Sequence, residues 1–173
     1  MATAATTPAI PGAVDVLCEQ VKAFHGALRR NVEGITHDES LAPPTRGGNC
    51  LNWVVGHLDW VNEQALSLLG QPAVLGEAAL SRYHRGSAEL HDAAEALPLE
   101  KLLSAWDESS ARIGAGLRSM PPQRLTEPAP FSPRKKPDET VGSLLSIIMF
   151  HQAYHVGQAG LLRRMAGKEG AIK

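Results

Sequence analysis

The chain has 173 residues, enough for one domain with a substantial hydrophobic core. Its 17 basic and 18 acidic residues nearly cancel, so neither nucleic acid nor a membrane surface is expected as a partner. No apolar run approaches the roughly 20 residues that span a bilayer, and the first residues do not resemble a secretory signal. Because Cys18 and Cys50 have no metal-binding or redox spacing, we expect a cytoplasmic protein with reduced thiols.

Four segments have the hydrophobic periodicity of amphipathic helices, and none alternates as a β-strand does. The first helix is expected at about residues 14–32, after a disordered tip formed by residues 1–12. The second follows a stretch rich in proline and glycine. Asn49 is its predicted N-cap, and the helix is expected to end near Leu69, before Gly70.

The third and fourth helices also have recognisable ends. The third begins near Pro98, because proline suits the first turn of a helix. The fourth begins at an N-cap formed by Asp138 or Thr140 and extends to about Met165. Gly167 is its predicted C-terminal stop.

Two longer connections separate the last three helices. Residues 71–97 lie between the second and third, and part of this segment, residues 87–96, is a candidate for a short extra helix. Residues 121–137 form a proline-rich loop between the third and fourth. We therefore predict an all-α fold in which residues 13–173 form a single four-helix bundle. Bundle cores commonly hold metal sites built from facing helices.

Two histidines four residues apart, His151 and His155, are the most informative feature of the last helix. Four residues is just over one helical turn, so both imidazoles project from one face. They continue an apolar stripe that includes Leu144, Ile148 and Leu162 and therefore face the predicted core. A buried polar group without a partner costs on the order of 1–3 kcal/mol. A shared metal ion would satisfy both rings; hydrogen bonding to facing side chains or water is the alternative.

His57 on the second helix is the candidate for a third ligand. It follows Gly56, whose missing side chain would permit close approach of a neighbouring helix or ligand. Three imidazoles would bind zinc at about 2.0–2.1 Å and leave a position for water or substrate. Nickel, iron, manganese and copper accept the same ligands. The zinc-protease motif is absent, since no glutamate follows His151.

The remaining candidates have weaker patterns. A structural or surface role is expected for His25, and surface positions are expected for His37 in a loop and for His84 and His91 in the long connection. Glu63 and Gln64 could approach His57, although solvation or packing is the simpler expectation. Cys18 is expected in the core. Cys50 stands at a helix start, where the pKa of a thiol can be lowered.

Three segments together resemble the DinB-like family, which also contains bacillithiol and mycothiol S-transferases. They are NWVVGHL at residues 52–58, RYHRGS at residues 82–87, and HQAYHVGQ at residues 151–158. Their order and spacing agree with the family over about residues 14–173. The resemblance implies a four-helix bundle with an up-down-down-up course and a homodimer. It also implies a divalent metal ion bound by His57, His151 and His155.

The resemblance to the thiol transferases implies a metal-dependent thiol S-transferase that acts on small electrophiles. The metal would be zinc or nickel first, with iron or manganese as alternatives, and a low-molecular-weight thiol would be the second partner. Gln158, one turn after His155, is expected to orient that ring or to contact the ligand. Tyr154 is expected to point toward a neighbouring helix. The alternatives are a metal-dependent hydrolase and a non-catalytic stress protein that binds a metal or a small ligand.

Overall fold

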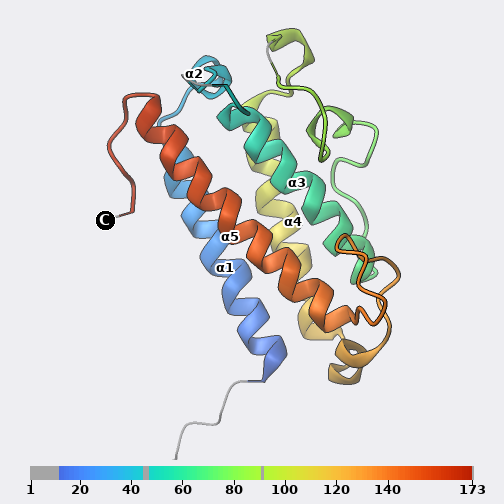
Figure 1. The fold of residues 1–173 in the computed structure, drawn as a ribbon. Coiled ribbons are helices and arrows are strands. Elements are labelled where there is room, and N and C mark those ends of the chain that lie inside the picture. The colour runs from blue at the N-terminus through green and yellow to red at the C-terminus, as the bar shows by residue number, and fades with distance from the viewer. Residues whose placement is uncertain (1–11, 45–46, 91, 173) are drawn as a thin grey trace, which may run out of the picture.

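The structure, a computed structural model, describes residues 12–44, 47–90 and 92–172, and its fold is all-helical (Figure 1). The long helices are α1 (Ala13–Val32), α3 (Leu51–Leu68), α4 (Leu99–Ser119) and α5 (Val141–Met165). The shorter elements are α2 (His37–Leu41) and the 3₁₀ turns η1 (Ser81–Tyr83), η2 (Ala93–Glu95) and η3 (Pro122–Thr126). No β-strand occurs in the described residues. Of the predicted disordered tip, only Gly12 is described, and it is the N-cap of α1.

The four long helices follow an up-down-down-up course, in which α1 and α5 run one way and α3 and α4 the other (Figure 1). α1 packs against α4 and α5, and α3 packs against the same two helices. Because α3 and α4 are parallel neighbours, residues 69–98 must return along the length of the bundle. α4 and α5 lie diagonally across the bundle, so residues 120–140 cross its end. The predicted four-helix bundle, its course and both long connections are confirmed.

Local signals at the helix ends explain most of the boundaries. Thr140 caps α5, because its hydroxyl accepts a bond from Ser143 N at 3.2 Å while the Ser143 hydroxyl accepts one from Thr140 N at 2.9 Å. Gly70 and Gly167 follow α3 and α5 with φ of 67° and 77°, a conformation that favours glycine. These three predicted positions are confirmed.

Two local predictions are wrong. The N-cap of α3 is Cys50 rather than Asn49, and its side chain makes no capping hydrogen bond. The extra helix expected over residues 87–96 is reduced to the single 3₁₀ turn η2. That segment packs over α3 through separate contacts, such as buried Leu90, instead of through a continuous helical face.

The long connection covers the outer side of α3, so this helix is buried almost all round. Leu80, Tyr83 and Leu90 of the connection are buried in the same hydrophobic cluster as Trp53 and Leu58 of α3. This cover explains why His57, on α3, has only 4% of its surface exposed. No described helix combines the length and the apolar character that a bilayer crossing requires.

A buried chain of hydrogen-bonded polar side chains joins α3, α4 and α5. Gln152 of α5 donates to Asn62 Oδ1 at 2.7 Å, and Asn62 of α3 donates to Ser109 Oγ of α4 at 2.7 Å. Since Gln152 directly follows His151, these bonds hold that part of α5 in register with α3. Asp59 is also buried, and burial raises the pKa of its carboxyl well above the usual range.

Candidate metal centre

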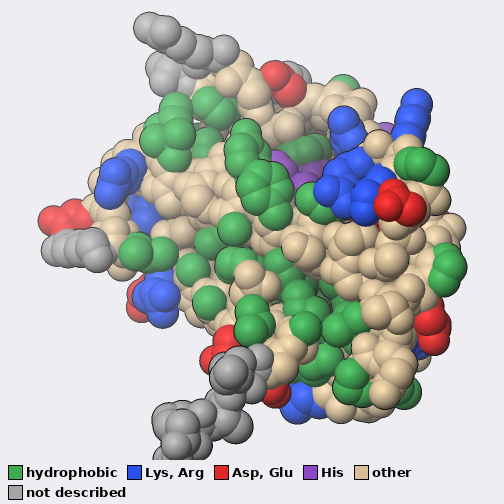
Figure 2. All heavy atoms as spheres, turned by 60° about the horizontal axis from the view of Figure 1, so that its bottom comes forward, with side chains coloured by type: hydrophobic (Ala, Val, Ile, Leu, Met, Phe, Trp, Pro, Cys, Tyr) green, Lys and Arg blue, Asp and Glu red, His purple; other side chains and the backbone are tan. Residues whose placement is uncertain are grey.

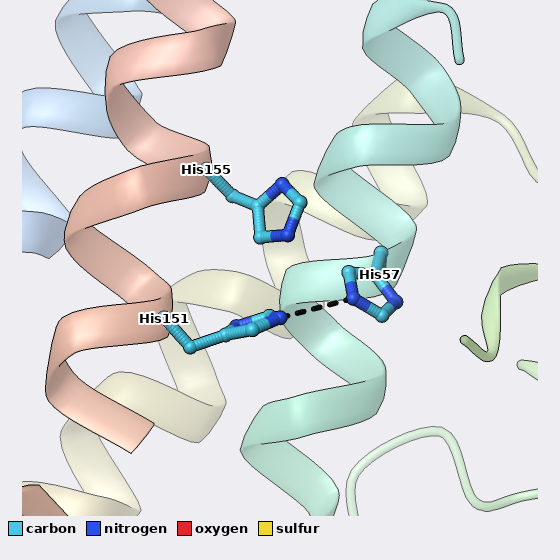
Figure 3. Close-up of side chains that lie close together, drawn as sticks. All are labelled: His57, His151 and His155. Atoms are coloured by element: carbon cyan, nitrogen blue, oxygen red, sulfur yellow. Dashed lines mark hydrogen bonds between the residues drawn. The ribbon is translucent and has the colours of Figure 1, made fainter. Parts of the chain in front are cut away.

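Three imidazoles converge between α3 and α5. His57 extends from α3, and His151 and His155 extend from successive turns of α5 (Figure 3). One nitrogen from each ring can be chosen so that all three lie within 4.8 Å of one another. The Nε2 atoms of His57 and His151 are 3.1 Å apart. Ligands of a tetrahedral zinc ion at about 2.0–2.1 Å lie about 3.3 Å from each other, so this spacing is close to what coordination requires.

His57 is held in place on three sides. Its ring stacks between the indoles of Trp53 and Trp60, with centroid distances of 4.6 and 5.6 Å and interplanar angles of 16°. Its Nδ1 lies 2.7 Å from the carbonyl oxygen of Tyr83. Because a carbonyl oxygen can only accept, Nδ1 carries the proton and Nε2 of the neutral ring has a free lone pair. That lone pair points toward His151.

His155 is oriented in the same manner by Gln158, one turn later on α5. Nδ1 of His155 donates to Oε1 of Gln158 at 2.8 Å, which leaves its Nε2 free to accept or to coordinate. A carbonyl or amide oxygen behind a histidine ligand fixes its tautomer and raises its basicity. Nδ1 of His151 is buried and has no hydrogen-bond partner among the described residues.

The surroundings favour the neutral form of all three rings. Burial lowers the pKa of His57 to about 4 and that of His151 to about 3, and it also lowers the pKa of His155. Charge on His155 lowers the pKa values of His57 and His151 further, and so does the positive charge of Arg85. Imidazole coordinates a metal in its neutral form, so these residues can bind one without losing a proton first.

A cavity of about 490 Å³ opens beside the histidines. Figure 2 shows histidine side chains at the bottom of a hollow, with hydrophobic groups on one side and lysine or arginine side chains on the other. Its lining contains the three histidines together with Asn49, Trp53, Arg85, Gly86, Phe150, Tyr154 and Gln158. The cluster is therefore accessible from one side to a small molecule.

Residues 82–87 hold one wall of this cavity against α3. Nε1 of Trp53 donates to the carbonyl oxygen of Arg82 at 3.1 Å and lies 2.9 Å from Oγ of Ser87. The carbonyl of Tyr83 accepts the bond from His57 described above. The sequence pattern indicated no roles for Tyr83 or Arg85. Both residues lie in the connection between α3 and α4, which has no helical periodicity from which its course over α3 could be predicted.

Most other candidates lie away from the cluster. His25 pairs with Asp107 at 2.7 Å on the opposite side of the bundle core, and His84 is exposed. Oε1 of Glu63 accepts bonds from the backbone of residues 74–76, which is a structural role. His91 lies outside the described residues. Gln64 is not among the residues that line the cavity.

Three details differ from the sequence-based expectations. His37 is the first residue of α2, where it is half-buried and Nδ1 accepts a bond from Leu99 N at 3.3 Å, so it is not a surface loop residue. Burial raises the pKa of the Cys50 thiol, which outweighs its position at a helix start. Tyr154 is 65% exposed and lines the cavity rather than packing on a neighbouring helix.

The residues present suit a divalent transition metal. All three donors are imidazole nitrogens. In His57 and His155, Nδ1 donates its proton to an oxygen, which leaves the lone pair of Nε2 free for a metal. In His151, the buried Nδ1 has no hydrogen-bond partner among the described residues. A direct hydrogen bond between His57 and His151 would require the proton of His151 on Nε2. Coordination of a metal ion would instead use a lone pair from each of the two rings, and it would account for the close approach of the nitrogens.

Comparisons with known proteins agree with this fold. The sequence model of the DinB superfamily matches residues 20–159. The crystal structure of a conserved protein from Enterococcus faecalis is similar with a TM-score of 0.71 and 17% identity, covering 92% of this chain and 100% of the other. At that identity the likeness concerns the fold alone. No curated protein matches the chain.

Proposed function

The chain belongs to the DinB superfamily, and on this basis we propose that it is a metal-dependent thiol S-transferase acting on small electrophiles. His57, His151 and His155 are the proposed metal ligands, and Gln158 is the proposed orienting partner of His155. Zinc or nickel is the first choice of ion, with iron or manganese as alternatives. The observation that carries the proposal is the cavity of about 490 Å³ beside a three-nitrogen cluster.

A divalent ion held by three neutral imidazoles would lower the pKa of a thiol bound to it and so supply a thiolate at neutral pH. The protein's own residues would bind the ion and orient the imidazole rings that hold it. Trp53, Trp60 and the carbonyl of Tyr83 fix the ring of His57, and Gln158 fixes that of His155. The bundle buries His57 and half-buries His151 and His155, and the cavity opens beside them.

The transfer itself needs two small molecules in the cavity. The thiol sulfur forms a bond to an electrophilic carbon of the second substrate with its own electron pair. The bond from that carbon to its leaving group breaks, and the leaving group departs with those electrons. The proton of the thiol goes to solvent. No acid or base of the protein is required, which agrees with the absence of a carboxylate among the described lining residues.

The same absence disfavours hydrolysis, because the described lining residues offer no carboxylate that could act as a general base toward an attacking water. The cavity disfavours a purely structural metal site, because structural sites usually have four protein ligands and no open side. Both alternatives would use the same three histidines. They differ from thiol transfer in what enters the cavity.

The ligand assignment is tested by the metal content of the purified protein. The wild type is expected to bind one ion per chain, and His57→Ala and His155→Ala are expected to lose it. His25→Ala is the matched control, because that histidine pairs with Asp107 outside the cluster. Unchanged stoichiometry in both site variants would refute the assignment.

The reaction is tested with the metal-loaded protein, a series of low-molecular-weight thiols and a haloaromatic electrophile. We expect product that contains both the thiol sulfur and the aromatic carbon, at a rate that depends on the thiol concentration. Turnover of the electrophile at the same rate without any thiol would exclude the transferase and support hydrolysis.

A further inference from the structure

Arg85 is the one cationic side chain in the described lining of the cavity, and the lining contains no acidic residue. Its guanidinium is exposed and makes no ion pair or hydrogen bond with the described residues. Some other arginines are neutralised by carboxylates: Arg82 lies 2.6 Å from Glu95, and Arg134 lies 2.7 Å from Glu139. An unpaired cation therefore faces the space in which a small molecule would bind.

The position of Arg85 is fixed by the fold and not by chance exposure. Residue 83 is bonded to His57 through its carbonyl, and the neighbouring carbonyl of Arg82 accepts from Trp53. The segment then turns at Gly86, whose φ of 84° is a left-handed conformation. On the other side of Arg85, Ser87 Oγ accepts a bond from Trp53 Nε1 at 2.9 Å, so the backbone of Arg85 lies between contacts to His57 and to Trp53 of α3.

Charge balance indicates what this arrangement accepts. Three neutral imidazoles leave a divalent ion with two positive charges, and Arg85 adds a third. A bound thiolate supplies one negative charge, which leaves Arg85 as a site for another anion. Guanidinium groups bind carboxylates with two parallel hydrogen bonds, an interaction that is stronger than one between neutral groups.

We propose that Arg85 is a specificity-determining residue that binds the carboxylate of the thiol substrate. The inference rests on the proposed function, because it assigns a charge to one of the two molecules that the reaction needs. Across the cavity, Phe150 and Tyr154 are 67% and 65% exposed, and their rings offer an uncharged wall for the rest of the molecule. The substrate class is therefore a small thiol with a carboxylate near its sulfur.

The test compares two thiols of almost the same size, 3-mercaptopropionate and its neutral amide 3-mercaptopropionamide. Their binding to the cobalt-loaded protein is measured by calorimetry and by the sulfur-to-cobalt charge-transfer absorption. The variants are wild type, Arg85→Gln and, as the matched control, Arg30→Gln, which removes an exposed arginine of α1 that lines a different cavity. The ratio of the two affinities is compared between variants, which cancels any difference in the acidity of the two thiols.

Wild type and Arg30→Gln are expected to favour the carboxylate thiol, and Arg85→Gln to reduce that preference roughly tenfold, with unchanged cobalt content. Retention of the full preference in Arg85→Gln would overturn the inference while leaving thiol binding at the metal intact. No charge-transfer band with either thiol would instead overturn the proposed function, and the inference with it. The two failures are thus distinguishable in one experiment.

Discussion

The backbone of Gly56 lies against the ring of Tyr83 so closely that a Cβ atom added at residue 56 would be 2.2 Å from Cδ1 of the ring. Real Cβ atoms essentially never approach that distance. The ring is itself fully buried, and its hydroxyl donates to Asn52 Oδ1 at 3.0 Å and accepts from Leu97 N at 2.7 Å. Gly56 thus determines where Tyr83 lies, and Tyr83 determines the tautomer of His57.

Gly56→Ala is expected to displace Tyr83, because the buried ring cannot yield without losing both hydrogen bonds. Overpacking a well-packed core costs about 1–3 kcal/mol, and the free energy of unfolding should fall by that amount. Metal affinity should fall as well, since the carbonyl of residue 83 moves from His57. Urea unfolding and metal titration measure the two effects. Gly157→Ala, where nothing lies within 4 Å of the added atom, should show neither effect.

Tyr83→Phe separates stability from metal binding. The variant keeps the ring and the backbone carbonyl but removes the hydroxyl, which leaves Asn52 and the amide of Leu97 without this partner. Unfolding should become easier by about 1–3 kcal/mol, while the metal affinity stays within twofold of wild type. Tyr154→Phe is the control, because that tyrosine is exposed. A large loss of metal affinity in Tyr83→Phe would show that the hydroxyl, not the carbonyl, positions His57.

Gln158→Leu is expected to weaken metal binding by about 10- to 100-fold, as the loss of an orienting partner typically does. The leucine has a similar size but no oxygen to accept the proton on Nδ1 of His155. Competition with a chromophoric chelator measures the change. Gln20→Leu, an exposed glutamine of α1, should bind the metal as wild type does. Equal affinities in the two variants would remove Gln158 from the site.

Glu139 is expected to make the stability of the fold depend on acid. Ser143, Arg134 and Ser132 donate to its carboxylate, and these bonds lower its pKa to about 2 from the ordinary 4.5. A carboxylate with a lowered pKa contributes stability above its unfolded-state value, and that contribution is lost as the pH falls toward 2. The melting temperature of the protein should therefore fall as the pH is lowered from 4.5 to 2.

Glu139→Gln is expected to be less stable than wild type at pH 7 and to lose less stability over that acid range. Asp138→Asn is the control. The side chain of Asp138 is 80% exposed, and its ion pair with Lys136, at 3.5 Å, is long and solvent-screened. Parallel pH profiles of wild type and Glu139→Gln would show that another carboxyl accounts for the acid sensitivity.

The long helices could be predicted because their signals are local. Apolar periodicity, the Thr140 cap and the glycines after α3 and α5 all lie within a few residues of the structure that they specify. Even α2 had such a signal: Thr36 and Glu39 form a capping box, in which Thr36 N donates to Glu39 Oε2 at 2.8 Å. That pattern, three residues apart, could have placed His37 in a helix.

The proximity of the three histidines could be predicted, because the apolar stripes of α3 and α5 that contain them had to face the same core. The wall of the cavity formed by residues 82–87 could not be predicted, since it depends on how residues 69–98 fold across α3. Gly56 was noted as a point of close approach, but the group that approaches it is a tyrosine ring 27 residues later. Cys50 shows the same limit, because its burial is set by distant segments. The homodimer and the cytoplasmic location stay predictions.

Two of the three tryptophans of the chain stack on the imidazole of His57. Indole emission responds strongly to a change in the electronic state of a ring in van der Waals contact. We therefore expect binding of an ion at this cluster to change the ultraviolet fluorescence of the unmodified protein. The packing that holds the ring in place also gives the molecule a built-in optical reporter.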